Sequence, residues 1–308
     1  MKERFHVLVG QDCNNNCIFC MEGHGRDRTF GETGLTAERI RTELKEHANV
    51  GYVMLASGEP TLSPSLPTYV NWARKFGYST IGLTTNARRL GYEPYCRHLL
   101  DSGLNHIVVS VHGADHRVHD AQTRCPKSFE QTIRGLEVLV RLRAEYRFSL
   151  HTSTVVGQRN VDTLGPIYEL LRRFEPDQYV FNVMQPLGRA GELKGLLLAQ
   201  YRDVVESFSR LFDQIPVPRP RMYLVDVPFC VTETLPGEVR GWVEGAVFTA
   251  FQPNGEAELR RTRVHKEQEN RVKQERCHLC RYDHECLGVW RAYVEVFGSS
   301  EFEPVLGG

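Results

Sequence analysis

Three cysteines, Cys13, Cys17 and Cys20, lie within eight residues in the segment CNNNCIFC. The segment follows the apolar run at residues 5–9, so we expect the thiols on a loop at the end of a strand. Thiolates at this density bind Zn²⁺ or an iron–sulfur cluster. His24 could complete a zinc site, whereas the CxxxCxxC spacing suits a loop around a larger cubane cluster in which three ligands leave one iron open.

The composition is that of an ordinary globular protein without a charge bias, with 308 residues of which 41% are hydrophobic and 25% charged. Lysine plus arginine and aspartate plus glutamate both number 38, so no basic field points to nucleic acid. No apolar stretch is long enough for a membrane span or a signal peptide, and we expect a cytoplasmic protein. In that compartment nine cysteines indicate ligands or reactive thiols rather than disulfides, and Cys96 and Cys125, which stand alone, are expected to be reduced.

Strand and helix patterns alternate over about 210 residues and form six strand-then-helix units. Right-handed crossovers bring such units into a parallel sheet with the helices outside. Eight units close a barrel and six leave it open, so we expect an α/β fold, a partial (β/α)6 barrel, over residues 1–215. We expect strands at residues 5–9, 52–56, 80–84, 107–111, 148–156 and 179–184, and helices at residues 36–49, 64–76, 95–102, 128–146, 161–174 and 192–213.

The conspicuous polar residues follow these strands, at the end of the barrel where α/β barrels carry their chemistry. After the cysteine loop they are, in chain order, Ser57, Gly58, Glu59 and Pro60, then Asn86, Ser110, His112, Asn160 and the stretch 185–189. His112, His116 and His119 are expected to be rim residues rather than metal ligands, because no fourth ligand accompanies them. The sequence therefore predicts one polar rim.

Beyond residue 215 the pattern changes, and residues 216–308 are expected to form a second unit. A proline-rich linker leads to two short strands at residues 222–227 and 247–251, and the Pro-Asn-Gly-Glu turn after the second suggests a β-hairpin. A final helix is expected to pack this unit on the barrel. The segment CHLCRYDHEC carries Cys277, Cys280 and Cys286, and with Cys230 it supplies four thiols, enough for one Zn²⁺ or one [4Fe–4S] cluster.

The segment CNNNCIFC, with the aromatic Phe19 before its last cysteine, resembles the signature of the radical SAM superfamily. The resemblance implies a [4Fe–4S] cluster on Cys13, Cys17 and Cys20 whose open iron is chelated by S-adenosylmethionine. Reductive cleavage of that molecule would yield a 5′-deoxyadenosyl radical. The same six-unit partial barrel is implied.

The resemblance also implies contacts with the cofactor. Gly58, Glu59 and Pro60 are similar to the family's GGE motif, which holds the methionine amino group, and Ser57 stands where the family often has glycine. Ser110 would face the ribose, while His112 occupies a position that is acidic in many members. The residues expected to bind S-adenosylmethionine are Phe19, Ser57, Gly58, Glu59, Pro60, Asn86, Ser110 and Asn160.

The cysteines of residues 216–308 resemble a twitch or shortened SPASM extension, which implies an auxiliary [4Fe–4S] cluster on Cys230, Cys277, Cys280 and Cys286. The expected activity is hydrogen abstraction from a peptide or protein side chain, as in maturases that crosslink, epimerise or oxidise peptides. One alternative is radical oxidation or rearrangement of a sugar- or nucleotide-like small molecule. Another is a non-catalytic iron–sulfur or zinc protein that senses redox state.

The expected partners follow from this chemistry. An electron donor such as flavodoxin or ferredoxin would reduce the first cluster. Because the chain begins directly at the first expected strand, peptide recognition would use the rim or a separate leader-binding partner. Neither a membrane nor nucleic acid is expected as a partner.

Overall fold

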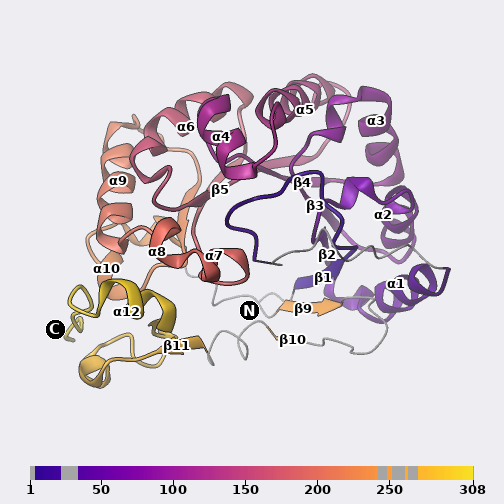
Figure 1. Cartoon of the computed structure of the whole chain (residues 1–308). Helices are drawn as coiled ribbons and strands as arrows, with labels where there is room; N and C mark the ends of the chain where they lie inside the picture. The colour runs from indigo at the N-terminus through magenta and orange to yellow at the C-terminus, as the bar shows by residue number, and fades with distance from the viewer. Residues whose placement is uncertain (1–3, 22–33, 242–247, 252–260, 263–269, 308) are drawn as a thin grey trace.

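A curved, mostly parallel sheet with helices on its outer side dominates the computed structural model, which describes residues 4–21, 34–241, 248–251, 261–262 and 270–307 (Figure 1). Within these residues the strand order is β10-β9-β1-β2-β3-β4-β5-β6-β7-β8, and every neighbouring pair is parallel except β9 with β10. The strands are β1 (Arg4–Leu8), β2 (Tyr52–Ala56), β3 (Thr80–Thr85), β4 (His106–Ser110), β5 (Ser149–Val156), β6 (Gln178–Val183), β7 (Met222–Val225), β8 (Arg240–Gly241), β9 (Phe248–Phe251) and β10 (Arg261–Thr262).

Apart from α12, which follows the last strand, the helices of the described residues lie between successive strands in the sequence. They are α1 (Gly34–Glu46), α2 (Leu66–Lys75), α3 (Glu93–Ser102), α4 (His116–Thr123), α5 (Ser128–Leu142), α6 (Leu164–Leu171), α7 (Arg189–Glu192), α8 (Lys194–Leu197), α9 (Tyr201–Gln214), α10 (Phe229–Thr232) and α12 (Arg291–Phe297). Among them none is both long and apolar enough to cross a membrane. The six expected strands and their order are confirmed, and the fold is the expected partial barrel.

One helix prediction was wrong in detail, and one helix was not predicted. The single helix expected at residues 192–213 is three helices, because Leu198 (ψ 137°) and Gln200 (ψ 139°) are extended and interrupt it before α9. Helix α4 was not expected, because its mean composition is polar. It is started by Asp115, whose carboxylate accepts a hydrogen bond from the Val118 amide at 3.0 Å.

The strands alternate between fully buried and half-buried residues, most regularly in β5 and β6. The buried residues face the helices: the Phe181 ring of β6 contacts the Phe208 ring of α9, with centroids 5.7 Å apart. Because successive side chains of a strand point to opposite faces, the half-buried set lines the inside of the barrel. That set includes Ser153 and Asn182, which are hydrogen-bonded to each other at 2.8 Å.

The chain beyond residue 215 contributes strands to the barrel sheet itself. Strand β7 pairs with β6, and β9 pairs with β1 at the opposite end of the strand order. The antiparallel pairing of β9 with β10 agrees with the expected hairpin, whose turn lies outside the described residues. A separate two-stranded sheet, β11 (Arg271–Val272) with β12 (Val289–Trp290), precedes α12.

Helix α5 approaches the end of β3 unusually closely at Gly135. A Cβ atom at this position would lie 2.2 Å from the carbonyl oxygen of Ala87. One turn earlier, the Thr132 hydroxyl donates a hydrogen bond to the carbonyl of Asn86 at 2.9 Å. The turn that carries Asn86 is therefore seated directly on α5.

Replacing Gly135 by Ala should lower the free energy of unfolding by about 1–3 kcal/mol, because overpacking against backbone outweighs the gain in helix propensity. Gly165→Ala in α6 is the matched control, since a Cβ atom there meets nothing within 4 Å. The control should change the free energy of unfolding by less than about 0.5 kcal/mol, because Gly165 lies in the first turn of α6 directly before Pro166. Urea unfolding followed by circular dichroism measures both. Equal stabilities of the two variants would contradict the close approach to Ala87.

Candidate functional site

The cysteine loop follows β1 at the carboxyl end of the barrel strands, and its three thiols are half-buried. Burial, followed by the neighbouring Cys13 and Cys20 sulfurs, raises the pKa of the Cys17 thiol to about 12. Three thiolates this close are stable only beside a compensating cation, which is how such a loop serves as a metal or cluster ligand set. His24, the alternative zinc ligand, lies outside the described residues. All nine cysteines are free thiols, as expected for Cys96 and Cys125.

One side of the cysteine loop is held by α4 and by Arg88. The amides of Asn16 and Ile18 donate hydrogen bonds to the carbonyls of Thr123 (2.8 Å) and Gln122 (2.9 Å), at the end of α4. The Arg88 guanidinium donates to the carbonyl of Asn14 and, at 2.8 Å, to the side-chain oxygen of Asn15. These contacts fix the segment between Cys13 and Cys17.

The other side is held by the loop after β6. The buried Arg189 guanidinium donates hydrogen bonds to the carbonyls of Asn16 (3.0 Å) and Cys17, and the Arg189 amide donates to the Cys20 carbonyl at 3.0 Å. Gly188 has φ +53°, and a Cβ atom there would lie 2.5 Å from the Met21 carbonyl oxygen. The positive charge of Arg189 lowers the pKa of Cys17, against the larger effect of burial. The sequence placed the 185–189 stretch on the rim and missed the role of Arg189.

The loop after β2 lies directly against the residues that precede Cys13. Ser57 and Gly58 both have positive φ, +77° and +53°. A Cβ atom on Gly58 would lie 2.4 Å from the Asp12 carbonyl oxygen, and the Glu59 amide donates a hydrogen bond to that oxygen at 2.7 Å. The left-handed conformation of Ser57 explains why glycine suits this position.

The Glu59 carboxylate is buried and accepts four hydrogen bonds from the protein. The donors are the Thr61 amide (3.2 Å) and hydroxyl (2.6 Å), the Thr85 hydroxyl (2.6 Å) and the Asn86 amide (2.7 Å). Desolvation raises the pKa of Glu59, and the hydrogen bonds oppose that rise. Glu59 therefore ties the loops after β2 and β3 together, and Pro60 begins the buried 3₁₀ turn Pro60–Leu62 beside it.

Of the remaining predicted cofactor residues, Asn86 and Asn160 join neighbouring loops, and Ser110 lies at the end of a strand. Asn86 links Glu59 to the cysteine loop, because its side-chain amide donates to Asn14 at 2.6 Å. Asn160 is buried, and its amide donates to the carbonyls of His112 (3.0 Å) and Val155 (2.9 Å), so it joins the loops after β4 and β5. Ser110 is half-buried at the end of β4, in register with Ser153.

The histidines expected on the rim are not alike. His112 is buried with its ring edge-on to Phe19, at a centroid distance of 4.7 Å. His119 is buried behind it, and its Nδ1 accepts a hydrogen bond from the His112 amide at 3.2 Å. His116 is exposed. The prediction that all three are rim residues was wrong for His119, which α4 carries into the interior.

The four cysteines of the carboxyl-terminal segment also converge. Cys230, Cys277, Cys280 and Cys286 line one small pocket together with Phe229 and Tyr282. Burial, followed by the Cys286, Cys280 and Cys277 sulfurs, raises the pKa of Cys230 to about 12. Within the described residues, no group of three or more His, Cys, Asp or Glu side chains is arranged to hold a single metal ion.

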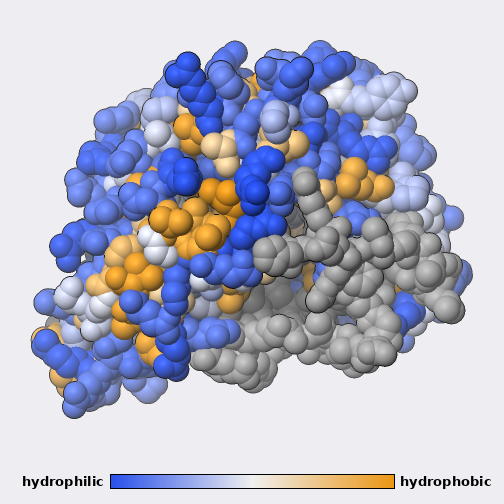
Figure 2. Space-filling view, in the orientation of Figure 1, coloured by the Kyte–Doolittle hydropathy of each residue, from blue (hydrophilic) through white to orange (hydrophobic). Residues whose placement is uncertain are grey.

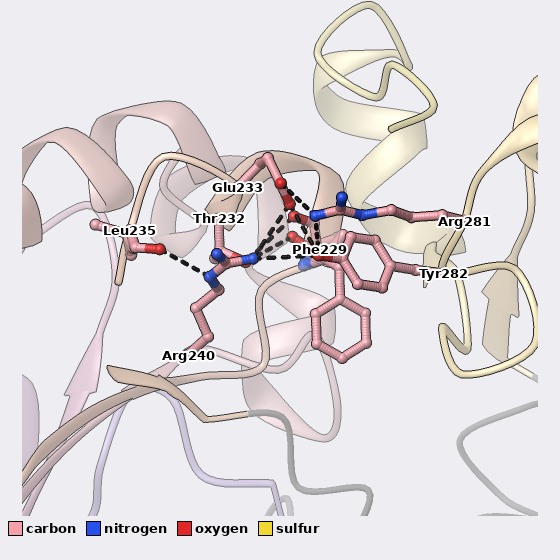
Figure 3. A network of polar contacts seen from close by, with 8 residues as sticks. Phe229, Thr232, Glu233, Leu235, Arg240, Arg281 and Tyr282 are labelled. Atoms are coloured by element: carbon pink, nitrogen blue, oxygen red, sulfur yellow. Dashed lines mark hydrogen bonds and ion pairs between the residues drawn. The ribbon is translucent and has the colours of Figure 1, made fainter. Parts of the chain in front are cut away.

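A polar network holds the Cys230 segment against the Cys280 segment (Figure 3). Glu233 accepts from Arg281 at 2.5 Å and from the Tyr282 hydroxyl at 3.0 Å, and it pairs with Arg240 at 3.1 Å. The Tyr282 ring stacks on Phe229 with centroids 4.8 Å apart. No local pattern in the sequence indicates this network, since the contacts between its two segments join residues 42 to 49 positions apart.

A buried ion pair connects the two cysteine groups. Asp226 follows β7; its carboxylate accepts from Gln185 at 2.6 Å and pairs with Arg271 at 3.4 Å. Arg271 also donates to the Gly288 carbonyl at 3.2 Å, and the Gly288 amide lies 3.4 Å from the Cys286 sulfur. Gln185 stands on the same loop as Arg189, so one chain of contacts runs from the first cysteine loop to the second.

The face beside the barrel opening is apolar. Figure 2 shows hydrophobic side chains gathered over α7 and α8, where Leu193 and Leu196 are 36% and 67% exposed. Met21, which follows Cys20, is 55% exposed. The site therefore combines the cysteine loop, the polar inside of the barrel and an apolar patch beside the opening. This patch, formed by the exposed side chains of Met21, Leu193 and Leu196, is called the apolar margin below.

Comparison with known proteins gives one family and several relatives. The model of the Radical SAM superfamily matches residues 7–171. The AdoMet-dependent heme synthase of Methanosarcina barkeri is 28% identical over 201 residues, which is 65% of this chain and 55% of that protein. The probable GTP 3',8-cyclase of Methanopyrus kandleri is 27% identical over 184 residues, 59% of this chain and 56% of that one. The chain thus spans about half the length of the curated relatives it matches.

Solved structures share the fold over almost the whole chain. Streptococcus suis SuiB bound to its precursor peptide SuiA has a TM-score of 0.70 at 14% identity and covers 98% of this chain and 74% of its own. The protein anSMEcpe with bound AdoMet and the Kp18Cys peptide has a TM-score of 0.67 at 16% identity, with 98% and 92% covered.

Replacing Ser57 by Gly should raise the free energy of unfolding by roughly 0.5–1 kcal/mol, because the left-handed conformation no longer meets a Cβ atom. Gly58→Ala should instead lower it by at least about 1 kcal/mol, through the clash with the Asp12 carbonyl. Chemical denaturation of both variants measures the difference. A Ser57→Gly variant less stable than the parent would show that the turn does not adopt this conformation.

Proposed function

The chain belongs to the Radical SAM superfamily, and from that premise we propose that it abstracts hydrogen from a peptide or protein side chain. It is a radical SAM enzyme, of a family that uses a 4Fe–4S cluster and S-adenosylmethionine. The observation that carries the proposal is the convergence of Cys13, Cys17 and Cys20 on one clamped loop at the barrel opening. When bound, the cluster and S-adenosylmethionine supply a 5′-deoxyadenosyl radical to the substrate.

The protein's own residues prepare the ligand set. Arg189 on one side and Arg88 with the end of α4 on the other bind the backbone carbonyls and amides of the cysteine loop. Their contacts hold the loop that carries the three cysteines in place. The high pKa of Cys17 fits this role, because a cationic cluster core would stabilise the thiolate form of its ligands.

The rim residues are proposed to hold S-adenosylmethionine. Since the Glu59 carboxylate is engaged by Thr61, Thr85 and Asn86, we assign the contact with the methionine amino group to backbone carbonyls of Ser57 and Gly58, which Glu59 and Pro60 keep in place. Phe19, Asn86, Ser110 and Asn160 are proposed to complete the cofactor site, Asn160 by positioning the loops around it.

A peptide substrate is supported by two observations. The apolar margin at Leu193, Leu196 and Met21 offers a binding surface beside the opening for an extended apolar segment. The structural neighbours SuiB and anSMEcpe are solved with peptides bound. Crosslinking, epimerisation and side-chain oxidation all begin with the proposed hydrogen abstraction, and a separate leader-binding partner could deliver the peptide.

A second candidate is radical chemistry on a small molecule. It is favoured by two relatives, a heme synthase and a probable GTP 3',8-cyclase, which are 28% and 27% identical to this chain, whereas the peptide-bound neighbours are 14% and 16% identical. The polar side chains of Ser153 and Asn182 inside the barrel suit a nucleotide or sugar. Mass spectrometry after incubation with S-adenosylmethionine and either GTP or peptides encoded beside the gene separates the two.

We also propose an auxiliary [4Fe–4S] cluster on Cys230, Cys277, Cys280 and Cys286, as in a twitch-like extension of residues 216–308. The network around Glu233 supports this, because it holds two separate segments together so that their four cysteines line one pocket. A set of four thiolates would saturate the cluster, which suits electron transfer rather than substrate ligation. Zinc is the alternative occupant of the same thiols.

Metal analysis of anaerobically prepared protein should find about eight irons per chain, from two cubane clusters. The triple variant Cys13→Ala, Cys17→Ala, Cys20→Ala should keep about four irons and lose all cleavage of S-adenosylmethionine, while Cys286→Ala should retain cleavage with sharply reduced product. Circular dichroism must show both variants folded, because metal sites contribute folding energy. About four irons and one zinc in the parent protein would exclude the auxiliary cluster.

Replacing Glu59 by Gln should lower the free energy of unfolding by about 1–3 kcal/mol, because one of its two acceptor oxygens becomes a donor that faces other donors. The Kd for S-adenosylmethionine should rise about tenfold or more as the loops loosen. Thr85→Val is the matched control: it removes one donor to Glu59 and the acceptor of the Ala87 amide, keeps the Glu59 charge, and should cost about 1–3 kcal/mol. A higher Kd for S-adenosylmethionine without any loss of stability would instead indicate direct contact between Glu59 and the cofactor.

A further inference from the structure

A short cationic loop lies against the outer side of the cysteine loop. It connects α4 to α5 and consists of Arg124, Cys125, Pro126 and Lys127. Arg124 and Lys127 are both exposed, and within the described residues neither forms a salt bridge. The chain as a whole carries no net charge, so this pair is a local feature.

The loop has a conformationally costly backbone that several hydrogen bonds maintain. Arg124 and Lys127 have φ of +50° and +65°, a region that residues with a side chain seldom adopt. Asp120 holds the loop in place, since its carboxylate accepts hydrogen bonds from the Lys127 amide (2.7 Å), the Ser128 hydroxyl (2.8 Å) and the Phe129 amide (2.8 Å). Strained backbone maintained by its surroundings is characteristic of functional surfaces.

The loop is also joined directly to the proposed cluster ligands. The Thr123 carbonyl, adjacent to Arg124, accepts a hydrogen bond from the Asn16 amide, next to Cys17. The Arg88 guanidinium lies 3.3 Å from the Cys125 sulfur and 2.8 Å from the Asn15 side chain, so it spans the two loops. A molecule seated on Arg124 and Lys127 would be separated from the cysteine loop by a single layer of protein.

We infer that the Arg124–Lys127 loop is the docking surface for the electron donor, an acidic one-electron carrier protein of the flavodoxin type. This inference rests on the proposed function, in which the first cluster takes up one electron from outside. The donor passes from its hydroquinone to its semiquinone, and the cluster is reduced by that single electron. Two exposed cations beside the loop that would carry the cluster supply steering and orientation for an acidic partner.

The test is a double charge reversal, Arg124→Glu with Lys127→Glu, in the reconstituted enzyme. Formation of 5′-deoxyadenosine driven by reduced flavodoxin, and the Kd of flavodoxin itself, are measured at about 50 mM and about 500 mM salt. At low salt we expect at least a tenfold slower reaction and a tenfold higher Kd, with both differences shrinking at high salt. Reaction driven by dithionite, which needs no docking, should be unchanged.

The matched control is Arg147→Glu with Arg173→Glu, which changes the total charge equally. Both residues are exposed and follow α5 and α6, so they lie at the opposite end of the barrel from the start of α5. This control variant should form 5′-deoxyadenosine at the parent rate with both reduced flavodoxin and dithionite. Should the reversed pair fold poorly, Arg124→Gln with Lys127→Gln should give about a threefold effect of the same salt dependence.

Three results would overturn the inference. One is an unchanged flavodoxin Kd in the reversed variant, and another is the same loss in the control variant. The third is an equal loss with dithionite, which would indicate that the loop serves the cofactor or an acidic peptide substrate. A parent enzyme that forms no 5′-deoxyadenosine with dithionite would instead overturn the proposed function, while the Kd measurement still tests the surface.

Discussion

The cysteine loop has no helix or strand of its own, and this is the constraint on which the site depends. A half-buried loop must find partners for its backbone amides and carbonyls elsewhere in the protein. Here the partners are the end of α4 and the guanidinium groups of Arg88 and Arg189, which approach from different sides. The barrel acts as a frame that brings these groups to a loop unable to order itself.

The same reasoning applies to the loops beside it. Glu59 gathers donors from the loops after β2 and β3, and Asn160 gathers carbonyls from those after β4 and β5. Each buried polar side chain satisfies groups on a neighbouring loop, so the rim is a connected set rather than a row of independent turns. The Gln185, Asp226 and Arg271 contacts extend this set to the second group of cysteines.

Local pattern was enough to predict the six barrel strands, the order of the rim residues and both cysteine groups, because these depend on alternation and spacing along the chain. The contacts that order the site were not predictable in this way. Arg88 binds residues more than 70 positions away and Arg189 binds residues more than 170 away, and nothing near either residue indicates its partner. Helix α4 was missed for a related reason, since a short polar helix has little periodicity of its own.

The pairing of β9 with β1 has a consequence for how the chain matures during synthesis. While the ribosome is still making the later part of the chain, β1 is an unprotected sheet edge, and the thiols that follow it lack Arg189. Such long-range pairing delays completion of the native sheet. The nascent chain therefore passes through a period in which its reactive cysteines are present and the structure that selects their cofactor is not.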